Sequence, residues 1–424
     1  MIARFSSLKA FFTYTFLLLF LVSFGQKIPE GNYVKVVEGF DWGSAVTKVI
    51  LPLNEEQRTF DHSNVQVVAE RQSECFPQNA TGLKGERSIL FSFISDNKGN
   101  RVDKGNHVTL VMAVGPDLSI GSPMQYFVGC GGTKWVNYNL IITDQSSGQV
   151  WDQEHDSISP IVDQFDLDGT FTYKDRQPLT YAAYKPTIAA SEKSPLIIWL
   201  HGSGEGGTDT TVPLLANKAA NYASEEIQSI FGGAFVLVPQ CQGAWMHNER
   251  GISTWGEEND VYNESLLALI KDFVNKNPKI DENRIYVGGC SNGGYMSLKL
   301  MLLDPDYFAA AYVSALAYKS KFLTDEEIER IANNSIWFIH SADDPATVAD
   351  ETVIPVYDRL IRAGAKDVHL SLYEHVVDLY GFYGGKDYRY NGHLSWIYSH
   401  SNHAAKVIDG KYTSVMEWMS GRRK

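Results

Sequence analysis

Hydrophobic and polar residues follow two different patterns along this chain. Between Tyr33 and Thr143, short apolar runs are separated by turn-forming segments such as Asp96-Asn97-Lys98-Gly99-Asn100, and no helical periodicity of useful length occurs. This pattern is typical of the strands of an antiparallel sandwich. We expect strands at Tyr33 to Val37, Val46 to Leu51, Val65 to Ala69, Ser88 to Ile94, Val108 to Val114 and Asn137 to Ile142.

After Phe165 the rhythm changes to strands that alternate with helices, which indicates a mainly parallel sheet covered on both faces. Leu196 to Leu200 is an apolar run of the kind found in a central strand. The organisation expected is therefore a sandwich over 26–145, a polar linker over 146–164 and an α/β domain over 165–424. Further strands are expected at Phe171 to Tyr173, Thr180 to Tyr184, Ala234 to Pro239, Ala309 to Ser314, Ile336 to His340 and Val368 to Tyr373.

One segment of the α/β region reads as strand, tight turn and helix. The apolar run Ile285 to Val287 ends in Gly289-Cys290-Ser291-Asn292-Gly293, and a helix-compatible segment, Tyr295 to Leu302, follows at once. This Gly-x-Ser-x-Gly turn is a nucleophile elbow, which raises the serine hydroxyl above the sheet. Glycine is required on both flanks because a side chain there would collide with the neighbouring strand or helix.

The partners that a nucleophilic serine needs follow in the chain. Asp344 comes just after the strand expected at Ile336 to His340, and His393 lies in Asn391-Gly392-His393-Leu394-Ser395-Trp396. Serine, then acid, then histidine is the chain order of α/β-hydrolases. The residues leave alternatives open, because Asp343 adjoins Asp344 and because His403 or His400 could replace His393.

The sequence also suggests groups around the serine. The expected oxyanion donors are the backbone N–H of Asn292 and an N–H from the glycine-rich loop His201 to Gly207, that of Ser203 being preferred. Trp245, soon after an expected strand, is a candidate wall of the substrate pocket, with a core position as the alternative.

Four segments together resemble a known group of enzymes: Gly-Gly-Cys-Ser-Asn-Gly-Gly-Tyr-Met, Leu-His-Gly-Ser-Gly-Glu, His-Ser-Ala-Asp-Asp-Pro and Gly-His-Leu-Ser-Trp. They are similar to those of α/β-hydrolase esterases related to polyhydroxybutyrate depolymerases, feruloyl esterases and prolyl-oligopeptidase-like enzymes. The N-terminal part, with Phe-Asp-Trp-Gly and Gly-Pro-Asp-Leu-Ser, resembles the immunoglobulin-like domain that precedes the hydrolase domain in a group of bacterial carboxylesterases.

The resemblance implies an α/β hydrolase behind an all-β immunoglobulin-like sandwich, and a serine esterase that uses Ser291, His393 and Asp344 without metal or organic cofactor. Two other classes remain open. A prolyl-oligopeptidase-like serine peptidase would use the same triad, but roughly 130 residues of sandwich cannot form the propeller of those enzymes. A non-catalytic binding protein could also keep the fold, although the intact set of motifs argues against it.

Composition narrows the partners. The net charge of −13 disfavours nucleic acid or an anionic membrane, because phosphate binding needs a basic surface. His62 and His107 lack a second ligand at metal-binding spacing. The partner that the resemblance implies is a small-molecule or polymer-linked ester, bound without a metal.

The N-terminus predicts export. Arg4 and Lys9 precede an apolar run from Ala10 to Val22, and Ser23-Phe24-Gly25 offers small residues for cleavage before Gln26. A signal peptide over 1–25 implies a secreted or periplasmic chain without membrane insertion after cleavage; an uncleaved anchor is the alternative.

The four cysteines permit disulfides in an exported chain, and Cys75 could pair with Cys130, or Cys241 with Cys290. The sandwich itself carries no candidate nucleophile or base. If it packs near the carboxyl ends of the parallel strands, it would overhang the crevice where ligands of such sheets bind.

Overall fold

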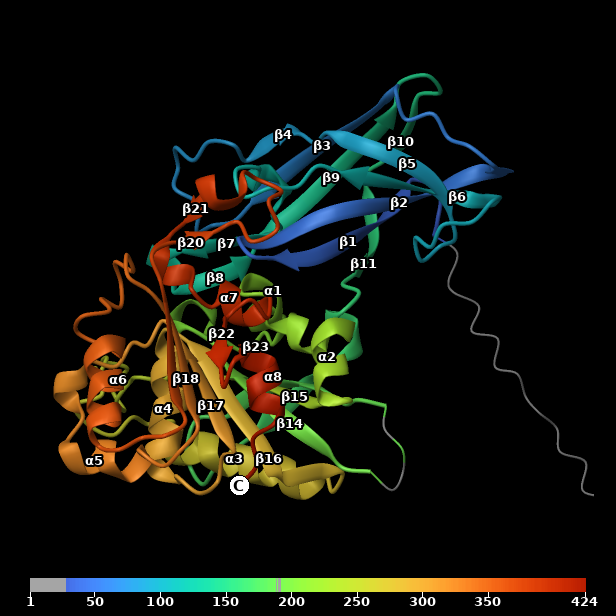
Figure 1. The fold of residues 1–424 in the computed structure, drawn as a ribbon. Coiled ribbons are helices and arrows are strands. Elements are labelled where there is room, and N and C mark those ends of the chain that lie inside the picture. Colours follow the sequence, from blue (N-terminus) through green and yellow to red (C-terminus); the bar gives the residue numbers. More distant parts are fainter. Residues whose placement is uncertain (1–27, 188, 190–191) are drawn as a thin grey trace, which may run out of the picture.

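The computed structural model describes residues 28–187, 189 and 192–424. The expected signal peptide lies outside the described residues. Figure 1 shows an all-β N-terminal domain stacked on an α/β domain, with the hairpin β7–β8 at the junction beside α1. This is the fold class that the sequence predicted. Among the residues named above, no helix is both long and apolar enough to cross a membrane.

The N-terminal domain consists of two sheets whose apolar faces meet in a common core. One sheet has the order β11 (Gln153–Ile158), β1 (Asn32–Phe40), β2 (Gly43–Gln57), β6 (Gly105–Met112) and β5 (Ile89–Ser95), and the other β10 (Gln149–Trp151), β9 (Asn137–Asp144), β3 (Val65–Gln72) and β4 (Lys84–Glu86). Along β9, buried Leu140 and Ile142 alternate with more exposed residues, as the period of two requires. In β1 and β2 both faces are covered: Val37 and Val49 enter the common core, and Val36 and Ile50 enter a smaller apolar cluster.

The expected linker over 146–164 is wrong in part, because it holds β10 and β11. Trp151 is buried in the sandwich, and β11 pairs in parallel with β1, Val36 opposite Ile158. β11 lies at the sheet edge and most of its side chains are exposed, so its sequence lacks the apolar alternation by which strands are recognised.

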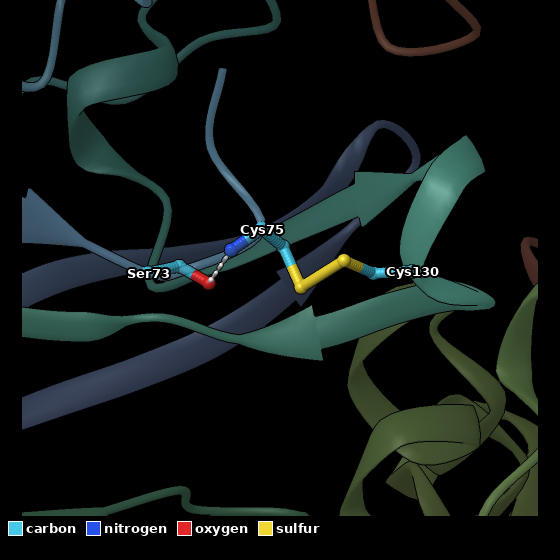
Figure 2. Close-up of a disulfide and its surroundings, with 3 residues drawn as sticks. All are labelled: Ser73, Cys75 and Cys130. Carbon is cyan, nitrogen blue, oxygen red and sulfur yellow. Dashed lines mark hydrogen bonds between the residues drawn. A yellow bond between two sulfur atoms is a disulfide. The ribbon is translucent and has the colours of Figure 1, made fainter. Parts of the chain in front are cut away.

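A third, two-stranded sheet in this domain is closed by a disulfide. β7 (Met124–Phe127) and β8 (Gly132–Trp135) pair as a hairpin, and Cys130 between them bonds to Cys75 with a Cα–Cα distance of 6.1 Å. Figure 2 shows this bond beside Ser73, whose hydroxyl accepts from the Cys75 N–H. The other possible pair does not form, since Cys241 and Cys290 are free and buried.

The α/β domain is built on an eight-stranded sheet. Its first three strands pair antiparallel and the remaining pairs are parallel. The order is β12 (Asp166–Phe171), β13 (Leu179–Tyr184), β15 (Phe235–Gln240), β14 (Ser194–Leu200), β16 (Ile280–Cys290), β17 (Ala310–Ser314), β18 (Ile336–Ser341) and β19 (Val368–Tyr373).

Helices cover both faces of this sheet. Alternate residues of β14 enter different apolar clusters, Ile197 and Trp199 on one face and Ile198 on the other. The first face packs against α1 (Thr211–Ala216), α2 (Glu225–Phe231) and α8 (Val415–Ser420), and the second against α3 (Asn263–Lys276), α4 (Asn292–Leu303), α5 (Asp325–Ile331) and α6 (Val353–Arg362). The cluster on the first face is continuous with the core of the sandwich, so apolar contacts join the two domains.

Candidate active site

The strand, turn and helix around Ser291 are formed as the sequence predicted. Ser291 has φ 54° and ψ −114°, between the end of β16 and the start of α4. A Cβ on Gly293 would lie 2.0 Å from the carbonyl oxygen of Leu200, and one on Gly289 would lie 2.5 Å from that of Gly293. Only glycine fits these two positions, and the turn therefore holds the strained serine at the carboxyl edge of the sheet.

The structure brings Ser291, His393 and Asp344 together. Nε2 of His393 lies 3.0 Å from Oγ of Ser291, and Nδ1 lies 2.9 and 3.1 Å from the two carboxylate oxygens of Asp344. Asp344 also accepts hydrogen bonds from Thr347. Burial alone would raise the pKa of this carboxyl, but the interactions with His393 and Thr347 lower it well below its usual value, so Asp344 is ionised.

The adjacent aspartate has a different partner. Asp343 Oδ2 lies 2.7 Å from Nδ1 of His375, and its backbone packs under Gly392, where a Cβ would lie 2.7 Å from the Asp343 carbonyl oxygen. The two rival histidines lie elsewhere. His400 is buried with its ring 4.4 Å from that of Trp199, and Nδ1 of His403 contacts the carbonyl of Ser401.

The two expected oxyanion donors belong to different elements. Ser203 begins the short 3-10 helix Ser203–Glu205, and its loop lines the same cavity as Ser291. Asn292 is the first residue of α4, so its N–H has no intrahelical acceptor. Its side-chain oxygen accepts from the N–H groups of Trp245 and Met246, which fixes the turn.

Trp245 is not a wall of the substrate pocket. Its side chain is fully buried, its Nε1–H donates to the carbonyl of His201 at 3.0 Å, and its ring packs on those of His201 and Tyr262. An indole that finds an internal acceptor can be buried completely. Here the indole contacts His201, the first residue of the His201 to Gly207 loop, and so supports that loop.

Ser291 and His393 open onto a cavity of about 490 Å³ that both domains line. The sequence suggested that the sandwich could overhang the crevice, but it did not identify the residues that line it, because nothing in those strands carries chemistry. The side chains from that domain that face the cavity include Trp42, Met124 and Tyr126, and those from the α/β domain include Asn217, Leu394 and Trp396.

Glu205 is a further polar group in this cavity that the sequence reading did not single out. It is 7% exposed, lies beside Gly202 and Asn217, and its Oε2 has no hydrogen-bond partner among the residues that the structure describes. Burial raises the pKa of this carboxyl from 4.5 to about 7. Its place in the Leu-His-Gly-Ser-Gly-Glu motif was the signal that could have identified it.

The segment before His393 reaches across to the N-terminal domain. It forms a hairpin of β20 (Val376–Val377) and β21 (Arg389–Tyr390). At its tip Tyr383 packs edge-on to Trp42, with ring centroids 4.9 Å apart, and its hydroxyl donates to the carbonyl of Val114 at 3.4 Å. The loop that carries His393 is therefore attached to both domains.

Comparisons with known proteins agree with this architecture. Residues 32–154 match the family described as the esterase Ig-like N-terminal domain, and residues 249–329 match the prolyl oligopeptidase family. The chain is similar to the crystal structure of a thermostable esterase, with a TM-score of 0.73 and 21% identity over 93% of this chain and 100% of that one.

A curated relative, poly(3-hydroxybutyrate) depolymerase of Ralstonia pickettii, is 27% identical over 172 residues, or 39% of this chain. The matched part spans 32% of that relative's length. An acylaminoacyl peptidase of Pyrococcus horikoshii aligns over 65% of this chain and 46% of its own with 17% identity and a TM-score of 0.41. The resemblance expected from the motifs, an immunoglobulin-like domain before an α/β hydrolase of the esterase and prolyl oligopeptidase group, is confirmed.

Proposed function

We propose that this chain, an α/β hydrolase fronted by an esterase-type immunoglobulin-like domain, hydrolyses carboxylic esters through an acyl-enzyme on Ser291. One observation carries the proposal: the unbroken hydrogen-bonded series from Ser291 through His393 to the ionised Asp344, which opens onto the shared cavity. A serine hydroxyl is a poor nucleophile unless a base accepts its proton, and this arrangement supplies the base and the acid that orients it.

In the proposed reaction, Ser291 Oγ attacks the ester carbonyl carbon while Nε2 of His393 takes the hydroxyl proton. The C=O bond becomes a single bond to an oxyanion, which the N–H groups of Asn292 and Ser203 would stabilise. Collapse of this intermediate breaks the bond to the alcohol, which leaves with the proton from His393. Water then repeats the sequence on the acyl-enzyme and releases the acid and free Ser291.

The test is turnover of p-nitrophenyl esters by the purified enzyme and by Ser291→Ala. We expect kcat to fall by about 10⁴-fold or more while the melting temperature stays close to that of the wild type. Ser147→Ala, in an exposed turn, is the matched control and should keep full activity. A fluorophosphonate should label Ser291 alone; unchanged turnover in Ser291→Ala, or a label on another residue, would contradict the proposal.

The prolyl oligopeptidase match favours amide hydrolysis by the same serine as a second candidate. A panel of p-nitrophenyl esters, feruloyl esters and aminoacyl amides separates the two, because an esterase should cleave the amides far more slowly than the esters. The depolymerase relative adds polymer-linked esters to the substrates to test, and release of soluble acids from a polyhydroxybutyrate suspension would measure that activity.

We also propose that residues 1–25 direct export and are then removed. The Cys75–Cys130 disulfide supports this, because structural disulfides persist in oxidising compartments. N-terminal sequencing of protein recovered outside the cytoplasm should begin at Gln26, and recovery of the full-length chain with the cells would favour a retained anchor.

A further inference from the structure

Resting on the proposed function, we infer that the disulfide-closed hairpin 124–135 of the N-terminal domain is a positioning element for the oxyanion loop 202–207. In this role the N-terminal domain would affect the chemical step itself, through the placement of the Ser203 N–H, in addition to shaping access to the cavity.

The hairpin meets the oxyanion loop at two points, one with the loop backbone and one through the Tyr126 ring. A Cβ on Gly132 would lie 2.3 Å from the carbonyl oxygen of Gly204, and a Cβ on Gly204 would lie 2.8 Å from Cε2 of Tyr126. A methyl group on Gly132 would therefore collide with backbone, and one on Gly204 would have to displace the Tyr126 ring. The residue that precedes Gly204 is Ser203, the proposed donor, so the hairpin packs within one residue of the group it would position.

The opposite side of the loop is held just as closely by the α/β domain. A Cβ on Gly206 would lie 1.9 Å from the carbonyl oxygen of Gly243, and the N–H of Gly207 donates to the carbonyl of Cys241 at 2.9 Å. The loop is thus enclosed between residues 241–243 on one side and the hairpin on the other. Removing either contact would leave it free to move on that side.

The hairpin is anchored firmly enough to act as a support. Cys130, at its turn, is bonded to Cys75 of the sandwich, as Figure 2 shows. Phe127 packs edge-on to Phe76 with ring centroids 5.1 Å apart. At the other end, Nε1–H of Trp135 donates to the hydroxyl of Thr211 in α1 at 2.9 Å. Covalent, apolar and polar contacts therefore connect the sandwich to the oxyanion loop.

An oxyanion donor is sensitive to small displacements. It must lie about 2.7–3.1 Å from the developing oxyanion, and removing one such donor typically costs about 10²–10³ in kcat. A displacement of the loop should lower kcat while ground-state binding, and hence KM, changes little, because the donor acts mainly in the transition state.

The decisive comparison uses two neighbouring glycines of the hairpin. Gly131 and Gly132 both have positive φ, 80° and 111°, but a Cβ on Gly131 meets nothing within 4 Å whereas one on Gly132 meets Gly204. Both alanine variants therefore carry backbone strain, and only one presses on the loop. In full-length enzyme we expect Gly132→Ala to lower kcat for a p-nitrophenyl ester about tenfold or more, with KM within about twofold of wild type, and Gly131→Ala to leave both nearly unchanged.

A second pair of variants keeps the inference testable if Gly132→Ala fails to fold. Gly204→Ala should lower kcat strongly when Tyr126 is present, because the new methyl group meets its ring. In a Tyr126→Ala background the same substitution should cost much less. Equal costs in the two backgrounds, or equal kcat in Gly131→Ala and Gly132→Ala, would overturn the inference.

These outcomes differ from a failure of the proposed function. If Ser291→Ala kept wild-type ester turnover, the proposed nucleophile would be wrong. If Ser291→Ala is inactive while the glycine variants behave alike, the nucleophile stands and the positioning role of the hairpin is rejected.

Discussion

The two domains contribute to one cavity in different ways. The α/β domain supplies every group that the proposed mechanism uses: Ser203, Ser291 and Asp344 follow parallel strands, and His393 follows the hairpin β20–β21. The N-terminal domain supplies the facing wall, with Trp42, Met124 and Tyr126. The proposed reaction depends on a few atoms held at fixed distances, whereas the shape of the cavity wall depends on how the two domains pack against each other. Substitutions on the two sides should therefore change different kinetic quantities.

The largest effect is expected on the chemical side, at the two adjacent aspartates. Asp344→Asn should lower kcat about 10⁴-fold, because the imidazole of His393 would lose the carboxylate that fixes its tautomer and stabilises its charged form. Asp343→Asn, which changes a contact to His375, should cost no more than about tenfold. Steady-state kinetics of the two variants measures this, and the reverse ranking would transfer the acid role to Asp343.

The N-terminal side should show its largest effect in stability. Replacing Cys75 and Cys130 together by serine opens a loop closed over a sequence separation of 55 residues, which corresponds to about 4 kcal/mol in the chain-entropy description. Urea denaturation of wild type and double variant measures this loss. A Cys241→Ser variant, in which a free cysteine is changed, is the comparison for side-chain effects, and equal stability of wild type and double variant would contradict the prediction.

Glu205, in the α/β domain, should make the free energy of unfolding depend on pH. Its pKa of about 7 in the folded state lies above the unfolded value of 4.5, so the folded protein binds this proton more tightly. The stabilisation is complete below pH 4.5 and is lost as the pH rises to about 7, a change on the order of 3 kcal/mol.

Urea denaturation at a series of pH values tests this dependence. Glu205→Gln, which cannot ionise, should remove this part of the decline between pH 4.5 and 7.5. A variant with the same slope as wild type would show that Glu205 is not the group responsible.

The smallest effect is expected at the wall. Trp42→Ala should change kcat/KM for a bulky ester by several-fold, about 1 kcal/mol, and should change that for an acetate ester less, because a small acyl group does not reach the N-terminal domain. Leu90→Ala, at an exposed position of the same domain outside the hairpin 124–135, is the control. Equal changes for both esters would show that Trp42 does not select between substrates.

The proximity of Ser291 and Asp344 could be predicted because each follows a strand of the parallel sheet, and parallel strands bring those ends to one edge. His393 follows the separate hairpin β20–β21, and only its motif and the chain order pointed to it. The elbow was also predictable, because glycine is required at positions where a side chain would collide with the neighbouring backbone. The errors have other causes. β11 was read as linker because an edge strand can be polar. For Trp245 the sequence left a pocket wall and a core position open, because sequence position does not tell which way an indole points.

That the sandwich might overhang the crevice could be expected, but the residues of the cavity wall could not be predicted from local patterns. Trp42, Met124 and Tyr126 become part of the cavity only because the apolar cluster of the sandwich continues into one face of the α/β sheet. That packing depends on the match of two whole surfaces, which no short motif encodes.

The hairpin between β20 and β21 bears on how such enzymes can diversify. Tyr383 at its tip contacts Trp42 and Val114, and the chain continues from this hairpin directly into the segment that carries His393. If recombination replaced the N-terminal domain alone, the new domain would lack the surface that Tyr383 contacts. We expect the two segments to be inherited together, so that a functional chimera must exchange residues 378–390 along with the sandwich.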